Sequence, residues 1–222
     1  MQPHQHATRR RRIVATVVGA AAAVALVAGS VGPAAAAPRP SGVAGNHHSP
    51  AVAALAVSAL EARDVYAWTG EAGAYQTYLG RLQVTADAVA MEFSTDPAVV
   101  RGAFERSDFE HQTAALAALS QLGKPYRYAT SDPGVGFDCS GLTAFAWRRA
   151  GVSLPQQSGA QMSVSPGVDP AVAEAGDLVQ YPGHVMMYLG FGDAIVHAAN
   201  SQNDVELSHA RRTPNWANPT GR

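Results

Sequence analysis

One cysteine and two histidines in the C-terminal half of the chain carry the residue types that nucleophilic catalysis needs. Cys139 is the only cysteine among 222 residues, so neither an internal disulfide nor a cysteine-based zinc cluster can form. Cys139 lies where a helix is predicted to begin, and the free backbone N–H groups there favour a thiolate and can hold a developing oxyanion. His184 and His197 follow on predicted neighbouring strands. The pattern predicts Cys139 as nucleophile, His184 as the base, and His197 as the residue that orients His184.

Other interpretations of these residues stay open. An isolated cysteine is usually a small core residue, and a histidine in a strand is usually a satisfied structural partner. A zinc site made of Cys139, His184 and His197 is a further alternative, although their spacing matches no recognisable ligand motif. His111 and His209 have polar neighbours in the sequence and are predicted to lie on the surface.

The elements that must position the candidate site are predicted as helices followed by short strands. Residues 138–150 favour a helix that Asp138 or Ser140 can cap and that Gly151 ends. Four helical patterns precede it, at about residues 51–65, 74–93, 98–106 and 111–122. Strands are predicted at residues 177–181, 184–191, 194–199 and 204–209. Helices followed by an antiparallel meander indicate an α+β fold.

The first 37 residues have the features of a secretory signal peptide. Four consecutive arginines, residues 9–12, precede an uncharged stretch over 13–27, and small side chains at 34–37 suit a signal peptidase. A permanent membrane anchor over 13–31 is the alternative, and the paired arginines also permit twin-arginine export. Residues 38–50, rich in Pro, Gly, Ser and His, are predicted to be a linker.

The charge balance shows no excess of basic residues that would indicate nucleic-acid binding, so we expect no nucleic-acid partner. The whole chain has 16 basic and 17 acidic residues; removal of residues 1–37 leaves 12 basic and 17 acidic ones, a net charge of −5. Such a protein is not steered towards anionic polymers. We expect a secreted or cell-wall-associated protein with no stable membrane insertion after cleavage. A lone thiol in an oxidising compartment then calls for a chemical explanation.

The chain from Leu122 onwards resembles the NlpC family of papain-like bacterial cell-wall peptidases. The resemblance rests on an ordered set of motifs over about residues 111–210. They are Gly123-Lys124-Pro125-Tyr126, Phe137-Asp138-Cys139-Ser140-Gly141-Leu142, Leu154-Pro155 with Gln161, Gly176-Asp177-Leu178, His184-Val185 with Tyr188-Leu189-Gly190, and Ile195-Val196-His197-Ala198. The hexapeptide around Cys139 is fairly specific alone, and the ordered set is much more so.

This resemblance implies a papain-like peptidase domain over residues 111–222, preceded by a helical region over 51–110. It implies hydrolysis of amide bonds in peptidoglycan stem peptides, commonly between D-glutamate and diaminopimelate, without metal or organic cofactor. Tyr126, Asp138 and Ser140 match positions that contact the amino end of the substrate in similar enzymes. Peptidoglycan is the expected partner, and we expect a monomer.

Three features depart from the family pattern. Residues 127–130 stand where the family often has glycines just after its Pro-Tyr motif. Met186 stands where the family often has glycine, so we expect a bulkier cleft floor, and His197 follows His184 by thirteen positions, one more than expected. A slip within the strand would turn His197 to the wrong face. Two other functions therefore stay open: an inactive wall-binding or scaffolding protein of the same fold, and an amidase or acyltransferase acting on another substrate. The helical region is expected either to overhang the cleft or only to stabilise the fold.

Overall fold

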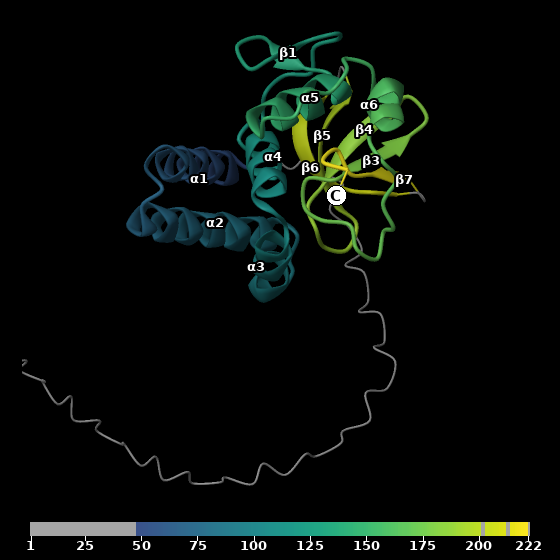
Figure 1. Ribbon diagram of the computed structural model, residues 1–222. Coiled ribbons are helices and arrows are strands. Elements are labelled where there is room, and N and C mark those ends of the chain that lie inside the picture. The colour runs from purple at the N-terminus through teal and green to yellow at the C-terminus, as the bar shows by residue number, and fades with distance from the viewer. Residues whose placement is uncertain (1–47, 201–202, 212–213, 222) are drawn as a thin grey trace, which may run out of the picture. The chain divides into compact units, whose positions relative to one another are not determined.

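The computed structural model describes residues 48–200, 203–211 and 214–221 (Figure 1). The predicted signal peptide and all but the last three residues of the predicted linker lie outside these ranges. Within them, no helix combines the length and the apolar character needed to cross a membrane.

Three helices open the described chain, as the sequence predicts. Helix α1 (Pro50–Thr69) begins at Ser49, whose hydroxyl accepts a hydrogen bond from the Val52 N–H, and ends at Gly70 in the left-handed conformation. Helix α2 (Ala72–Glu92) runs beside α1 (Figure 1). Helix α3 (Pro97–Arg106) is capped by Asp96, and proline occupies its first position. The N-terminal helical region is therefore confirmed.

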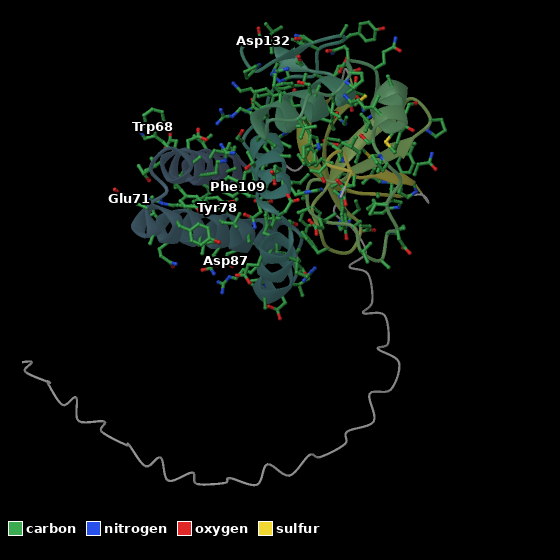
Figure 2. All side chains as sticks on the ribbon, in the orientation of Figure 1. Trp68, Glu71, Tyr78, Asp87, Phe109 and Asp132 are labelled. Atoms are coloured by element: carbon green, nitrogen blue, oxygen red, sulfur yellow. The ribbon has the colours of Figure 1, made fainter. Side chains whose placement is uncertain are left out.

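Helix α4 (Phe109–Leu119) connects this region to the rest of the fold. It contacts α1 on one side and α5 (Cys139–Arg149) on the other, and all its residues from 111 to 119 are buried. On α2, Tyr78 donates a 2.6 Å hydrogen bond to Gln112 Oε1 and packs its ring against Phe109 (Figure 2). The predicted domain boundary between residues 110 and 111 falls inside α4.

An antiparallel five-stranded sheet forms the second layer. Its order is β6 (Asn203–His209), β5 (Ala194–Asn200), β4 (His184–Tyr188), β3 (Leu178–Tyr181) and β7 (Asn215–Ala217). Helix α5 packs against β4 and β5 (Figure 1). These elements confirm the α+β fold. The sequence did not indicate β7, the small hairpin of β1 (Ser131–Asp132) and β2 (Gly136–Phe137), or helix α6 (Ser158–Val164).

The two faces of the sheet serve different purposes. Val185, Met187 and Val196 belong to the main core, which the helices share. The residues between them point the other way, because successive side chains of a strand alternate between faces. Met186 and Ile195 accordingly form a second, smaller cluster. His184 and His197 have the same parity as this second cluster, so both histidines lie on the face turned away from the helical core.

Candidate active site

The start of α5 is held by the carboxylate of Asp138. Its Oδ1 accepts a hydrogen bond of 2.6 Å from the Gly141 N–H, and its Oδ2 accepts one of 2.8 Å from the Ala129 N–H. The Ser140 hydroxyl also donates to Oδ1, at 3.2 Å. Asp138 is therefore the residue that caps the helix, and both of its oxygens are engaged within the chain.

Gly141 permits a close approach of the preceding loop to this helix start. A Cβ atom at Gly141 would lie 1.9 Å from the carbonyl oxygen of Thr130. The same oxygen accepts a 3.2 Å hydrogen bond from the Asp138 N–H. Any side chain at position 141 would push the loop away from the nucleophile.

Gln161 supports the first turn of α5 from the other side, a role that the sequence did not indicate. Its side chain is fully buried, and its Nε2 donates to the carbonyl oxygens of Ser140, at 2.8 Å, and Pro155, at 2.9 Å. Its Oε1 accepts a 2.7 Å hydrogen bond from the Thr143 hydroxyl. Two of these three bonds hold the first turns of α5, and the third ties Gln161 to the loop that follows the helix.

Cys139 is partly buried, and burial raises the pKa of its thiol. Backbone N–H groups of Val185 and Ser140 reach the sulfur and act against this shift, while the negative charge of Asp138 adds to it. The N–H groups at the helix start therefore favour the thiolate, as expected, but desolvation outweighs them. The thiol needs a base to become a nucleophile.

The structure brings His184 and His197 together. Their Nε2 and Nδ1 atoms are 2.7 Å apart, and their rings meet edge to face with centroids 5.0 Å apart. Strands β4 and β5 pair through Met187 with Val196 and Tyr188 with Ile195, which makes the two histidines diagonal neighbours on one face. This register turns His197 to the same face as His184, so the thirteen-residue spacing does not displace it to the wrong face.

His184 is poised as a neutral base. Burial, and then the proximity of His197, lower its pKa to about 4. At neutral pH its imidazole is therefore uncharged and can accept a proton. The Val185 N–H, from the residue that follows His184, reaches the sulfur of Cys139, so the thiol lies against the start of the same strand.

A hollow of about 560 Å³ opens beside the histidine pair on the second face of the sheet. Met186 and Ile195 supply apolar walls of this hollow beside the two histidines. Met186 thus contributes the bulk expected from its departure from the family pattern. The described residues that line this hollow come from the sheet and its loops, and none comes from α1 to α4. Cys139 does not line this hollow either, so the expectation that the helical region overhangs the cleft stays a prediction.

Tyr126, from the loop before the β1–β2 hairpin, lies near Cys139. It forms an isolated bridge with Phe137, and burial together with the nearby charges of Cys139 and Asp138 raises its pKa. Tyr126 is half-buried, whereas Asp138 and Ser140 are buried. All three residues predicted to contact substrate therefore lie at or beside the start of α5.

His111 corrects the prediction that it lies on the surface, because only 1% of it is exposed. Its Nδ1 lies 2.8 Å from Asp108 Oδ1, and its Nε2 lies 3.2 Å from Asp177 Oδ1. Burial alone would lower its pKa, but the hydrogen bonds to Asp177 and Asp108 outweigh burial and raise it. His209 is exposed beside Asp193, as predicted.

The carboxylate of Glu174 brings one more oxygen to the His111 cluster. Ligand atoms of Asp108, His111 and Glu174 lie within 4.8 Å of one another, a spacing that a metal ion could bridge. Both ring nitrogens of His111, however, already face carboxylates. The cluster is therefore complete as an ion-pair network within the fold.

Glu206 is a residue near the site that sequence reasoning missed. It stands directly opposite His197 in the pairing of β5 with β6, and its Oε1 lies 3.4 Å from His197 Nε2. The signal that could have found it is strand alternation combined with the register of the β5–β6 hairpin, which the sequence alone does not fix.

Comparisons with known proteins agree with the motifs. A profile of the NlpC/P60 family matches residues 123–220. A probable endopeptidase of Corynebacterium glutamicum is 37% identical over 118 residues, 52% of this chain and 51% of that protein. Peptidoglycan endopeptidase RipB of Mycobacterium tuberculosis is 40% identical over 111 residues, 43% of this chain and 46% of RipB. The chain thus spans about half the length of these curated relatives.

One solved relative has a different function. RipD of Mycobacterium tuberculosis, described as a non-catalytic NlpC/p60 domain protein adapted to peptidoglycan binding, is 30% identical. The match covers 50% of this chain and 98% of the RipD structure, with a TM-score of 0.43. Residues 123–220 of this chain form a domain of the NlpC/P60 family.

Proposed function

We propose that this protein is a secreted cysteine endopeptidase that hydrolyses amide bonds in peptidoglycan stem peptides. The observation that carries the proposal is the 2.7 Å contact between His184 and His197, on strands that also bring the Val185 N–H to the only thiol of the chain. A binding protein would have no need to align a thiol, a neutral imidazole and a second imidazole.

The first half of the reaction forms an acyl-enzyme. His184 removes the thiol proton of Cys139 as the sulfur attacks the carbonyl carbon of the scissile amide. Backbone N–H groups at the start of α5 stabilise the negative oxygen of the tetrahedral intermediate. The imidazolium of His184 then gives its proton to the leaving amine, the C–N bond breaks, and a thioester on Cys139 remains.

The second half consumes water. His184, again neutral, takes a proton from a water molecule that attacks the thioester carbonyl. The C–S bond then breaks, the product leaves as a carboxylic acid, and the proton held by His184 returns to the sulfur. His197 holds the His184 ring in place through both halves, and it shares the positive charge that forms on the pair.

The substrate class follows from the relatives and from the charge around the nucleophile. RipB is named as a peptidoglycan endopeptidase, and a Bacillus cereus relative that is 33% identical over 119 residues is named as a γ-D-glutamyl-L-lysine dipeptidyl-peptidase. We propose the bond between D-glutamate and diaminopimelate as the target here. Asp138 and the hydroxyls of Tyr126 and Ser140 would face the amino end of the stem peptide, where a carboxylate favours a free ammonium group.

Purified protein incubated with defined muropeptides tests this proposal. We expect product masses that report hydrolysis after D-glutamate. Cys139→Ala should reduce the rate by at least about a thousandfold, as nucleophile deletions do. Equal cleavage by the variant would exclude a cysteine mechanism. Wild-type protein that sediments with insoluble peptidoglycan but releases no fragment would instead support the wall-binding function.

A further inference from the structure

A buried carboxylate lies behind the histidine pair. Only 7% of Glu206 is exposed, and its Oε2 has no hydrogen-bond partner among the described residues. A buried carboxylate without a partner is costly, so its retention calls for a cation or a donor nearby. The nearest candidate is His197, whose Nε2 also lacks a hydrogen-bond partner and lies 3.4 Å from Glu206 Oε1.

The order of contacts determines which nitrogen carries each proton. A carboxylate only accepts, so His197 must carry a proton on Nε2 to be attracted to Glu206. In neutral His197 this leaves Nδ1 as an acceptor, and Nδ1 is the atom 2.7 Å from His184 Nε2. His184 must then donate from Nε2, and its Nδ1 keeps the lone pair that can take the thiol proton.

We propose that Glu206 is a positioning residue that completes a relay from His184 through His197 to a buried carboxylate. It fixes the tautomer of His197 and compensates the positive charge that the pair acquires when His184 takes the proton of Cys139. The present distance of 3.4 Å is long for a hydrogen bond, and such contacts tighten when charge develops in the reacting complex. The inference rests on the proposed function, because it assigns a role within that reaction.

Other groups that can titrate or carry charge face the same hollow. They are Tyr181 at the end of β3, His209 at the end of β6 and Arg211 after it, besides His184 and His197 themselves. His209 is paired with Asp193 on the surface. A change in pH dependence must therefore be traced to individual histidines, which NMR can do.

The experiment measures thiol reactivity without any wall substrate. Alkylation of Cys139 by iodoacetamide is followed as a function of pH in wild-type protein, Glu206→Gln and Asp204→Asn. Asp204→Asn is the matched control, because it removes the same charge two residues away on β6, next to His48 rather than His197. We expect Glu206→Gln to slow alkylation at pH 7 about tenfold, which is the effect of raising the pKa of the Cys139 thiol by about one unit. Asp204→Asn should leave the alkylation rate unchanged.

Two further measurements keep the inference separate from stability and from the proposed function. Nitrogen-15 NMR should show the Nε2–H tautomer of His197 in wild-type protein and its loss in Glu206→Leu, with Glu206→Gln retaining it through its amide oxygen. Wild-type alkylation rates and tautomer in both Glu206 variants would overturn the inference, even if their melting temperatures fell. If muropeptides are not cleaved while alkylation still responds to Glu206, the relay stands and the proposed function fails.

Discussion

Two histidine clusters in this fold contain the same kinds of side chain but shift the pKa of their histidines in opposite directions. His111 is enclosed between Asp108 and Asp177, which raise its pKa. The ring of His184 contacts the imidazole of His197, and burial together with that neighbour lowers its pKa to about 4. The first cluster therefore shifts its histidine towards the charged form, and the second keeps His184 neutral at neutral pH.

The difference shows how to separate a structural histidine from a reactive one. Both ring nitrogens of His111 face carboxylates, so its charge is compensated inside the protein and no proton has reason to move. In the second cluster a ring nitrogen of His197 has no hydrogen-bond partner within the described part of the chain, and the pKa of His184 leaves a free base. An unsatisfied but aligned network can change its protonation state during a reaction, whereas a complete one stabilises the fold.

The largest expected effect is on the reactive cluster. His184→Ala should lower kcat/KM on muropeptides by roughly 10²–10⁴-fold, because both proton transfers lose their base. His197→Ala should cost less, about 10–100-fold, as for residues that orient another functional histidine. Steady-state kinetics on the two variants tests this order. A nearly silent His184→Ala beside a severe His197→Ala would mean that their roles are exchanged.

The structural cluster should respond in stability rather than in chemistry. His111→Gln leaves the fully buried carboxylate of Asp177 without its cationic partner, which should lower the free energy of unfolding by about 3 kcal/mol. The folded pKa of His111 lies above 6.5, so its charge stabilises the fold fully below pH 6.5 and this stabilisation is lost as the pH rises through the raised value. The deficit of the variant should therefore be larger at pH 6 than at pH 9.

Urea denaturation at both pH values, together with kcat measured under folding conditions, tests this expectation. His209→Gln is the matched control, because His209 also contacts an aspartate, Asp193, but on the surface. Its loss should cost less than about 1 kcal/mol. Equal effects of the two substitutions would show that the buried cluster has no special weight, and a large loss of kcat in folded His111→Gln would contradict its purely structural role.

The smallest expected effect is the response of wild-type activity to mild acid. With a His184 pKa of about 4, the base stays neutral at pH 5 and kcat/KM should change little between pH 7 and pH 5. An unperturbed histidine would leave only roughly 3% of the base form at pH 5. The lowered pKa also means that stability declines as the pH falls from 6.5 towards 4, so circular dichroism must accompany the rates. A midpoint near 6.5 would contradict the buried neutral base.

The sequence was most informative where function depends on local order. Sequence patterns predicted the helix start at Cys139, the strands at His184 and His197 and the α+β order of elements. Each of these depends on a cap, a turn or an alternation of apolar and polar residues that is contained in a short stretch of sequence. Short elements such as β7 and α6 were not predicted, since three to seven residues show too little periodicity to identify an element.

Properties that depend on packing could not be predicted. His111 has polar neighbours in the sequence, yet α4 is enclosed on all sides by helices and strands. The raised pKa of Cys139 comes from burial, which a helix-start argument does not include. Glu206 depends on which residue of β6 stands opposite His197, and a hairpin whose turn is not known leaves that register open.

Because Gly141 has no side chain, the loop before α5 packs directly against the helix start, and protein engineering cannot change this contact. Other segments near Cys139 can be changed. The carbonyl of Thr130 lies against the Cα of Gly141, and the Ala129 N–H is bound by Asp138, so this stretch and the helix start form one unit. A saturation library at position 141 should therefore return almost only glycine. The adjoining hairpin tip at 132–135 is exposed, and that is where a foreign loop could be grafted beside Cys139 without disturbing the helix start.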